Sequence, residues 1–430
     1  MGSGRSDSIV IRGAIVMACV IPALATSPAA SAGQGSTEAL PVRVTLDDVL
    51  RLLNDRSPRT IADRATVDVA ATDRITANTL PNPSISYGGL RLVSGLSTGA
   101  INQDQVVIDQ PLLMFRQRQT RRDLADLNVA AERAHVAATL AGRRLEVRQA
   151  FAELLARQEE LRILQESRHE LQRIAQIVAG RARAGDRSQY DVLRIETEGQ
   201  TLDVEVMNAS TDVDDASGHL AALLGFPGWR PSAAGQLDPG TTPIDLDVLW
   251  DTAQHRLPAV IVAERQQNVA RGGLIAAERE RLPVPSLSGG ALFTREDTGT
   301  SVFFGASVPL PLFDRNRGAI ARATAEIDAA TRGATAELAE ARAEVERTRA
   351  VYVSRRQTLT TVESDLVQRV PTLRRMAEDA YREGQGTILE LLDASRSLKD
   401  IQLLHLKQLE LTKLAEEAVI SAAGLDAQAP

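Results

Sequence analysis

Aromatic side chains and cysteine are scarce in this chain of 430 residues, and each shortage excludes a class of protein. Aromatic residues make up 3% of the sequence. Because aromatics supply much of the area that a compact core buries, we expect long elements packed through Ala, Leu and Val instead of a large globular enzyme. The single cysteine, Cys19, excludes an internal disulfide framework and any site built from several cysteines. The net charge of −7 leaves no basic footprint for nucleic acid, so we expect no such partner.

Apolar runs long enough for a membrane-spanning helix are also missing. The longest, residues 13–25, follows two arginines and falls short of the roughly 20 residues that a span needs. With the small residues Ala30 and Ala32 behind it, this run predicts a signal peptide over residues 1–32 and therefore export. The alternative is a lipoprotein cleavage box with lipidation at Cys19, which the continuation of the apolar run past that cysteine disfavours.

The sequence repeats itself at an offset of about 200 residues, the signature of a tandem duplication. Four short sequence matches recur in the same order in both halves. Any one match could arise by chance, but four in the same order are hard to obtain that way. They are Leu46 to Leu50 with Leu246 to Leu249, Leu80-Pro-Asn-Pro-Ser84 with Leu282-Pro-Val-Pro-Ser286, Pro111-Leu112 with Pro311-Leu312, and Gly185 with Gly384.

Each copy predicts the same order of elements, in a mainly α fold with a small β part. The first repeat, 33–228, is predicted to hold a helix (59–79), two strands within 83–113, a long helix (115–182) and a return helix (188–224). The second, 229–426, is predicted to hold a helix (259–281), two strands within 285–312, a long helix (316–383) and a return helix (388–423), before a tail, 427–430. Segments 40–57 and 226–257, rich in Pro, Gly and Asp, are predicted to be irregular.

The long segments carry the pattern of a coiled coil. No proline interrupts residues 112–226, and apolar residues from Val147 to Val178 recur three, four and seven apart. The strands alternate small polar and apolar side chains, which suits a sheet with one wet face or a barrel with lipid outside. Four strands per chain cannot close a membrane barrel, because such barrels need at least about eight. A barrel would therefore have to be shared among copies in cyclic symmetry.

Several motifs give the chain a family resemblance. They are the signal peptide, the duplicated Leu-Pro-x-Pro-Ser strand start, Pro309-Leu-Pro-Leu-Phe-Asp-Arg-Asn-Arg-Gly318, Tyr381-x-x-Gly384 and Leu391-Leu-Asp-Ala394. Together they resemble the TolC-type outer-membrane efflux proteins over residues 40–426. The segment Pro309 to Gly318 is especially similar to the CzcC-like cation-efflux branch. One departure is that the strands lack the Trp and Tyr girdles typical of membrane interfaces.

The resemblance implies a homotrimer with a twelve-stranded barrel in the outer membrane of a Gram-negative-type cell and a twelve-helix tunnel in the periplasm. It implies contact with outer-membrane lipid, a periplasmic membrane-fusion adaptor and an inner-membrane pump, which we expect to be of the RND type. The function implied is that of the channel component of a tripartite efflux or secretion system, a passive exit duct for metal cations or small toxic compounds. The alternative is a periplasmic coiled-coil adaptor or scaffold that forms no membrane barrel.

The resemblance also implies a gate at the second helix turn. Glu390 and Asp393, one helical turn apart, match positions that form an acidic ring around the periplasmic aperture. Acidic residues are also favoured at any helix start, which is the simpler interpretation. Asp191 and Tyr381 match a polar latch between the two turns, and Gly386 stands where a basic partner of that latch would be found.

The helix turns and one proline complete the candidate sites. The resemblance implies adaptor docking at the tips, through Gly185 and Ser188 in the first repeat and Gly384 and Thr387 in the second, although such glycines also serve simply to end helices. Pro371 would kink the long helix near its end, as a hinge for opening or as a tolerated kink.

Nothing in the sequence predicts catalysis. The histidines do not cluster at ligand spacing, so we predict no metal site, and we expect no cofactor and no catalytic residue. An enzyme is disfavoured because the chain has no nucleophile elbow, phosphate loop or metal motif.

Overall fold

The computed structural model describes residues 40–95, 102–183, 189–240, 242, 245–294 and 299–426. The predicted signal peptide, Cys19 and the tail 427–430 lie outside the described residues. All the described elements belong to one unit that begins at Pro41.

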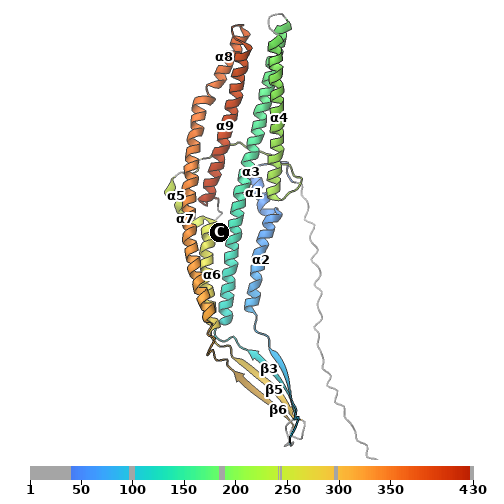
Figure 1. The fold of residues 1–430 in the computed structure, drawn as a ribbon, viewed down its shortest axis with the longest axis vertical. Helices are drawn as coiled ribbons and strands as arrows, with labels where there is room; N and C mark the ends of the chain where they lie inside the picture. Colours follow the sequence, from blue (N-terminus) through green and yellow to red (C-terminus); the bar gives the residue numbers. More distant parts are fainter. Residues whose placement is uncertain are drawn as a thin grey trace, which may run out of the picture. The chain divides into compact units, whose positions relative to one another are not determined.

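Helices dominate this unit, with a small sheet at one end of them (Figure 1), and the predicted fold class is confirmed. The elements of the first repeat are β1 (Arg43–Val44), α1 (Leu46–Asp55), α2 (Pro58–Asn78), β2 (Ser84–Leu90), β3 (Gln103–Pro111), α3 (Gln117–Arg183) and α4 (Gln189–Leu224). Those of the second are β4 (Ser232–Ala233), α5 (Leu246–Arg256), α6 (Pro258–Glu280), β5 (Ser286–Thr294), β6 (Thr300–Ser307), α7 (Arg317–Val362), a π-helical turn η1 (Glu363–Val367), α8 (Val370–Arg382) and α9 (Ile388–Ala422).

The segments predicted to be irregular contain two short helices, so that prediction is wrong. Thr45 and Asp48 form a capping box at the start of α1, and the Asp245 carboxylate accepts hydrogen bonds from two backbone amides at the start of α5. The polar residues that suggested loops are therefore helix caps. Next to these helices β1 pairs in parallel with β4, which joins the two repeats.

Helix α3 is the centre of the helical part. It packs against α2 and α4 of its own repeat and against α6 and α9 of the other, while α7 packs against α6 and α9. Apolar residues spaced at helical intervals bury the shared faces, among them Val147, Leu154 and Val178 of α3. Among the described residues, no helix combines the length and the apolar character that crossing a membrane requires.

The helix predicted over 316–383 is divided in the structure. Helix α7 ends at Val362, the π-helical turn follows, and α8 begins with Pro371 in its first turn. Proline has no amide hydrogen to continue the helical ladder, but its fixed backbone angle suits a first turn. The chain thus starts a new helix at this proline.

The larger sheet is antiparallel with strand order β2-β3-β5-β6. Its central pair, β3 and β5, comes from different repeats, and β2 and β6 form its two edges among the described strands. The register gives the sheet one mainly apolar and one mainly polar face, since side chains alternate along each strand. The mainly apolar face carries Ile85, Tyr87, Val106, Ile108, Leu287, Ala291, Phe293, Val302 and Phe304, with Asp104 and Gln110 as polar exceptions. The mainly polar face carries Ser84, Ser86, Gln105, Ser286, Ser288, Ser301 and Ser307, with Leu90, Val107, Leu292 and Phe303 as apolar exceptions.

Candidate functional site

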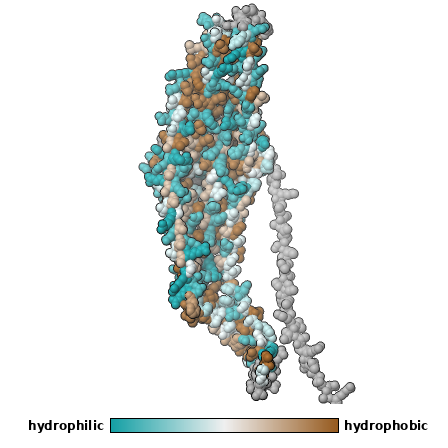
Figure 2. All heavy atoms as spheres, viewed as in Figure 1, coloured by the Kyte–Doolittle hydropathy of each residue, from teal (hydrophilic) through white to brown (hydrophobic). Residues whose placement is uncertain are grey.

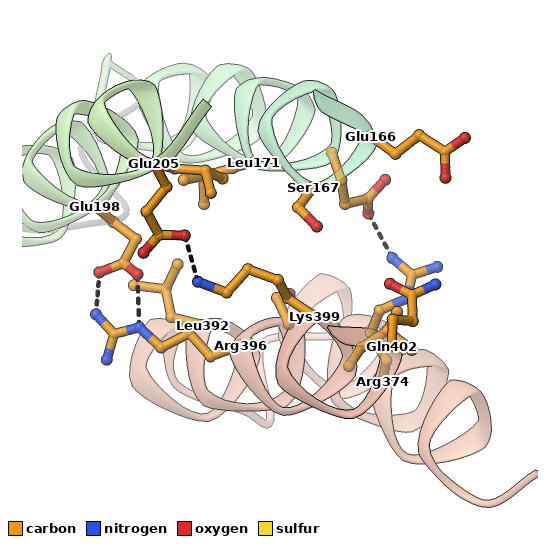
Figure 3. A pocket seen from close by; sticks show the side chains of 14 residues that line it. Glu166, Ser167, Leu171, Glu198, Glu205, Arg374, Leu392, Arg396, Lys399 and Gln402 are labelled. Carbon is orange, nitrogen blue, oxygen red and sulfur yellow. Dashed lines mark hydrogen bonds and ion pairs between the residues drawn. The ribbon is translucent and has the colours of Figure 1, made fainter. Parts of the chain in front are cut away.

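A cavity of about 200 Å³ lies between the two helical hairpins, α3–α4 of the first repeat and α8–α9 of the second. Its lining is amphipathic: Leu171, Leu202 and Leu392 form the apolar part, and carboxylates and cations from facing helices form the polar part. Figure 3 shows Glu198 and Glu205 on one side of the cavity opposite Arg396 and Lys399 on the other.

Three ion pairs cross this cavity, and we call them the inter-repeat salt-bridge cluster. Arg396 binds Glu198 through both Nε and a terminal nitrogen, with the Nε bond at 2.6 Å. The Lys399 Nζ lies 2.8 Å from Glu205, and Arg374 binds Glu170. In all three pairs the acid belongs to the first repeat and the base to the second. A weaker pair of opposite polarity, Arg173 with Glu378 at 3.9 Å, lies beside them.

The cluster adjoins an apolar core that joins the same two hairpins. This core contains Leu171 and Ile174 of α3, Ile195 of α4, Tyr381 of α8 and Leu391 of α9. Because the ion pairs lie at its edge, side chains such as those of Glu198 and Arg396 remain partly exposed. Exposed pairs typically contribute at most about 1 kcal/mol, and two-point arginine–carboxylate contacts are the strongest of them. The cluster therefore adds specificity to a contact that the apolar core stabilises.

The carboxylate of Glu198 shows the electrostatic consequence. The hydrogen bonds from Arg396 lower the pKa of Glu198 below its ordinary 4.5, against partial burial, and the charges of Arg396, Lys399 and Arg194 act in the same direction. The acid therefore stays ionised, and the pair intact, over the whole neutral range.

The predicted latch residues lie at the outer end of this core. Tyr381 is 1% exposed, near the end of α8, and Asp191 is half-buried in the first turn of α4. A contact between their side chains stays a prediction.

The predicted acidic ring residues are both exposed at the start of α9, but they differ in role. Glu390 forms a capping box with Thr387: its carboxylate accepts a 2.9 Å bond from the Thr387 amide, and the Glu390 amide donates to the Thr387 hydroxyl. Asp393 lies one turn further on, where its charge raises the pKa of Arg396 after the larger effect of Glu198. Glu390 thus has a structural task in addition to any role in an aperture.

The turn between α8 and α9 depends on its glycines. Gly384 has a left-handed backbone (φ 78°), and the amides of Gln385 and Gly386 both donate to the Ala380 carbonyl, which closes the end of α8. A side chain at Gly386 would come within 3.2 Å of Ala380. The tip residues Gly185 and Ser188 of the first repeat lie outside the described residues.

Sequence reasoning missed both the salt-bridge cluster and a second group of buried charges near the end of α9. There Glu416, 2% exposed, accepts bonds from Lys413, Thr242 and the Gly240 amide, and so attaches the connection between the repeats to α9. Glu417 pairs with Arg148 of α3 at 3.1 Å. All three lysines of the chain lie on α9, and each pairs with a glutamate.

A sequence signal for the salt-bridge cluster existed. Glu198 and Glu205 are seven residues apart and so lie on one helix face, as do Arg396 and Lys399 at a spacing of three. The spacing alone does not say which face meets which helix. The described residues contain no group of three or more His, Cys, Asp or Glu side chains that could hold a metal ion.

Comparison with known proteins supports the fold described above. Residues 249–425 match the family described as outer membrane efflux protein. The cobalt-zinc-cadmium resistance protein CzcC of Cupriavidus metallidurans is 27% identical over 256 residues, which cover 54% of this chain. The match spans 61% of CzcC, less than two thirds of its length.

Two solved structures show the same fold over most of the chain. The outer-membrane channel OprN is 18% identical, with a TM-score of 0.66 over 88% of this chain and 89% of OprN. The CusC structure is 17% identical, with a TM-score of 0.70 over 88% of this chain and 92% of CusC. The family match over residues 249–425 and the shared fold over most of the chain confirm the predicted resemblance to the TolC-type outer membrane efflux proteins.

Proposed function

We propose that three copies of this chain form a passive duct through the outer membrane, the exit component of a tripartite efflux or secretion system. The observation that carries the proposal is the four-stranded sheet, which has two unpaired edges and one mainly apolar face among the described strands. An apolar sheet face flanked by open edges is costly for a lone soluble chain.

Closure of the sheet among copies removes both costs. Edge β6 of one copy would pair with edge β2 of the next, and three copies would bring twelve strands into one barrel with its apolar face toward lipid. The polar face, rich in serine, would then line a water-filled passage. The long helices of each copy would continue this passage into the periplasm, where an adaptor and an inner-membrane pump would meet the helix turns.

The salt-bridge cluster supports a role for the helical end as a gate. It links hairpins from different repeats beside the helix turns, so separation of α4 from α9 must break Glu198–Arg396 and Glu205–Lys399. Such a device keeps the resting duct narrow without consuming energy. The latch, the acidic ring and a hinge at Pro371 belong to the same proposed gate.

The class of exported compound follows from similarity and charge. CzcC is named as a cobalt-zinc-cadmium resistance protein. With the exposed carboxylates Glu390 and Asp393 at the helix turn, this favours metal cations, with small toxic compounds as the second class. A periplasmic adaptor or scaffold is disfavoured, because it would leave the apolar sheet face in water.

Expression of the full chain in an outer-membrane host tests the proposal. We expect a heat-modifiable trimer in the outer-membrane fraction that gives stepwise conductance in planar bilayers, and metal sensitivity when the gene is deleted. A monomer in the soluble periplasmic fraction without conductance would contradict the proposed function.

A further inference from the structure

The chain passes between the sheet and the helices at four junctions, α2–β2, β3–α3, α6–β5 and β6–α7, and hydrogen bonds and an ion pair connect these junctions. The Arg118 guanidinium donates to the Asn78 carbonyl, joining the end of α2 to the start of α3. The Arg121 side chain pairs with Glu280 at 2.7 Å, joining α3 to the end of α6. The side-chain amide of Asn316 donates to the Ala277 carbonyl, and the backbone amide of Leu112 donates to the Pro285 carbonyl. These bonds make the junctions one continuous band across the chain.

This band exposes large apolar side chains at its sheet side. Phe313 is 99% exposed, Leu310 71% and Met114 65%. Leu80 and Leu312 are exposed as well. Figure 2 shows hydrophobic surface gathered where the helices meet the sheet, with hydrophilic surface on the adjoining helix ends. A soluble surface has no reason to concentrate such residues.

The exposed residues continue the apolar face of the sheet beyond its strands. In β6 that face carries Val302, Phe304 and Ala306, and the same alternation continues through Val308 and Leu310. The described strands β2 and β6 have seven and eight residues. A strand that crosses the hydrocarbon layer needs about 9–11 residues. The apolar residues of the junctions therefore extend the apolar face of the sheet toward the length that a membrane requires.

Arginines border the same band on its helix side. Residues 111–123, 278–285 and 308–318 hold eight arginines against four carboxylates, in a chain whose net charge is −7. The carboxylates are Asp123, Glu278, Glu280 and Asp314, and the arginines are Arg116, Arg118, Arg121, Arg122, Arg279, Arg281, Arg315 and Arg317. Among the ion pairs of the described residues, only Arg121 of these arginines takes part. Asp314 is engaged with the Asn316 backbone amide.

We infer that this band is a basic collar that binds the phosphate head groups of an anionic phospholipid leaflet, with Phe313, Leu310 and Met114 inserted at the edge of the acyl region. Arginine and aromatic side chains suit this boundary, because each has an apolar body and a polar end. The collar would mark the membrane boundary in place of the Trp and Tyr girdle that the strands lack. This inference rests on the proposed function, since it requires the sheet to lie in a membrane.

Spin labels at single cysteines test the apolar half in the full chain, whose sole natural cysteine is Cys19. Labels at Phe304→Cys, Phe313→Cys and Ala329→Cys report the sheet face, the collar and the exposed surface of α7. In vesicles of phosphatidylethanolamine and phosphatidylglycerol, we expect the label at 304 to contact oxygen in the acyl region, that at 313 to lie at the interface, and that at 329 to contact a water-soluble relaxant.

The three labels separate the ways in which the inference could fail. If the label at 313 is as accessible to the water-soluble relaxant as the label at 329, while the label at 304 lies in lipid, the collar does not contact the membrane. The proposed channel would then still stand. A label at 313 that is immobile and shielded from both oxygen and relaxant would overturn the collar as well, because a neighbouring copy then covers the band. A wet label at 304 would contradict the proposed function itself.

The charged half is tested by lipid selectivity. We expect the reconstituted protein to prefer spin-labelled phosphatidylglycerol over phosphatidylcholine by about fivefold, the factor that one arginine near an anionic surface supplies. The variant Arg315→Gln with Arg317→Gln, which leaves six of the eight arginines, should lower this ratio. The matched variant Arg265→Gln with Arg332→Gln removes two exposed helix arginines away from the collar and should keep it. Equal ratios for the two variants would overturn phosphate binding by the collar.

Discussion

Arg116 and Asn316 occupy the same place in the two repeats and share a left-handed backbone, with φ of 62° and 56°. Each directly precedes a long helix, α3 or α7. Non-glycine residues rarely adopt this conformation, so the shared turn is a structural mark of the duplication. It redirects the chain from the sheet into the helices.

Asn316→Ala should destabilise the protein by about 1–2 kcal/mol, because alanine tolerates the left-handed backbone poorly and cannot replace the 2.8 Å bond to the Ala277 carbonyl. Asn316→Gly removes only that bond and is the control. Thermal unfolding followed by circular dichroism measures both. Equal melting temperatures for the two variants would show that the backbone conformation contributes nothing.

Charge reversal tests the salt-bridge cluster. Glu198→Arg or Arg396→Glu alone brings like charges together across the cavity, and each should raise the resting conductance of the channel in planar bilayers. The double variant restores an opposite pair and should return the conductance toward that of the wild type. Glu196→Arg, an exposed change on the same helix, is the control. A double variant no better than the singles would contradict a direct pairing.

Acid should loosen the same contact. The pKa of Glu198 is lowered in the folded state, so its stabilising effect is fully present above the ordinary value of 4.5 and is lost as the pH falls through the lowered pKa. We expect resting conductance to rise in that acidic range. Glu198→Gln cannot titrate there, so its conductance should depend less on pH. Identical pH profiles would assign the effect to other carboxylates.

The acidic ring can be tested without damage to the helix that carries it. Glu390→Gln keeps a capping side chain, whereas Glu390→Ala also removes the cap and should cost about 1 kcal/mol. Glu390→Gln with Asp393→Asn should therefore lower cation selectivity and divalent block while the melting temperature stays close to that of the wild type. Unchanged selectivity would leave Glu390 with its capping role alone.

The proposed latch predicts a larger resting current when either partner is shortened. Asp191→Ala and Tyr381→Phe should each raise it, and the double variant should raise it no further than the stronger single, because one contact is lost in every case. Conductance of single channels measures this. Additive effects would indicate that the two side chains act separately.

The sequence predicted the mainly helical class because helix periodicity is local and the duplication doubles each signal. It could not predict α1 and α5, since Thr45 and Asp245 carry the same chemistry in a loop as in a cap. It could not predict the salt-bridge cluster either. Which face of α4 meets α9 depends on how both helices pack with α3, and no local pattern encodes that rotation.

The order of charges along α9 distinguishes the two halves of the chain. Arg396 and Lys399 meet acids of the first repeat, whereas Glu417, further along the same helix, meets Arg148. At the offset of 199 residues that pairs Gly185 with Gly384, the first-repeat counterpart of Arg396 is Thr197, so two copies of the first repeat would leave Glu198 without its cation. The two halves are therefore complementary in charge at this contact, a property that two identical halves would not have at Glu198.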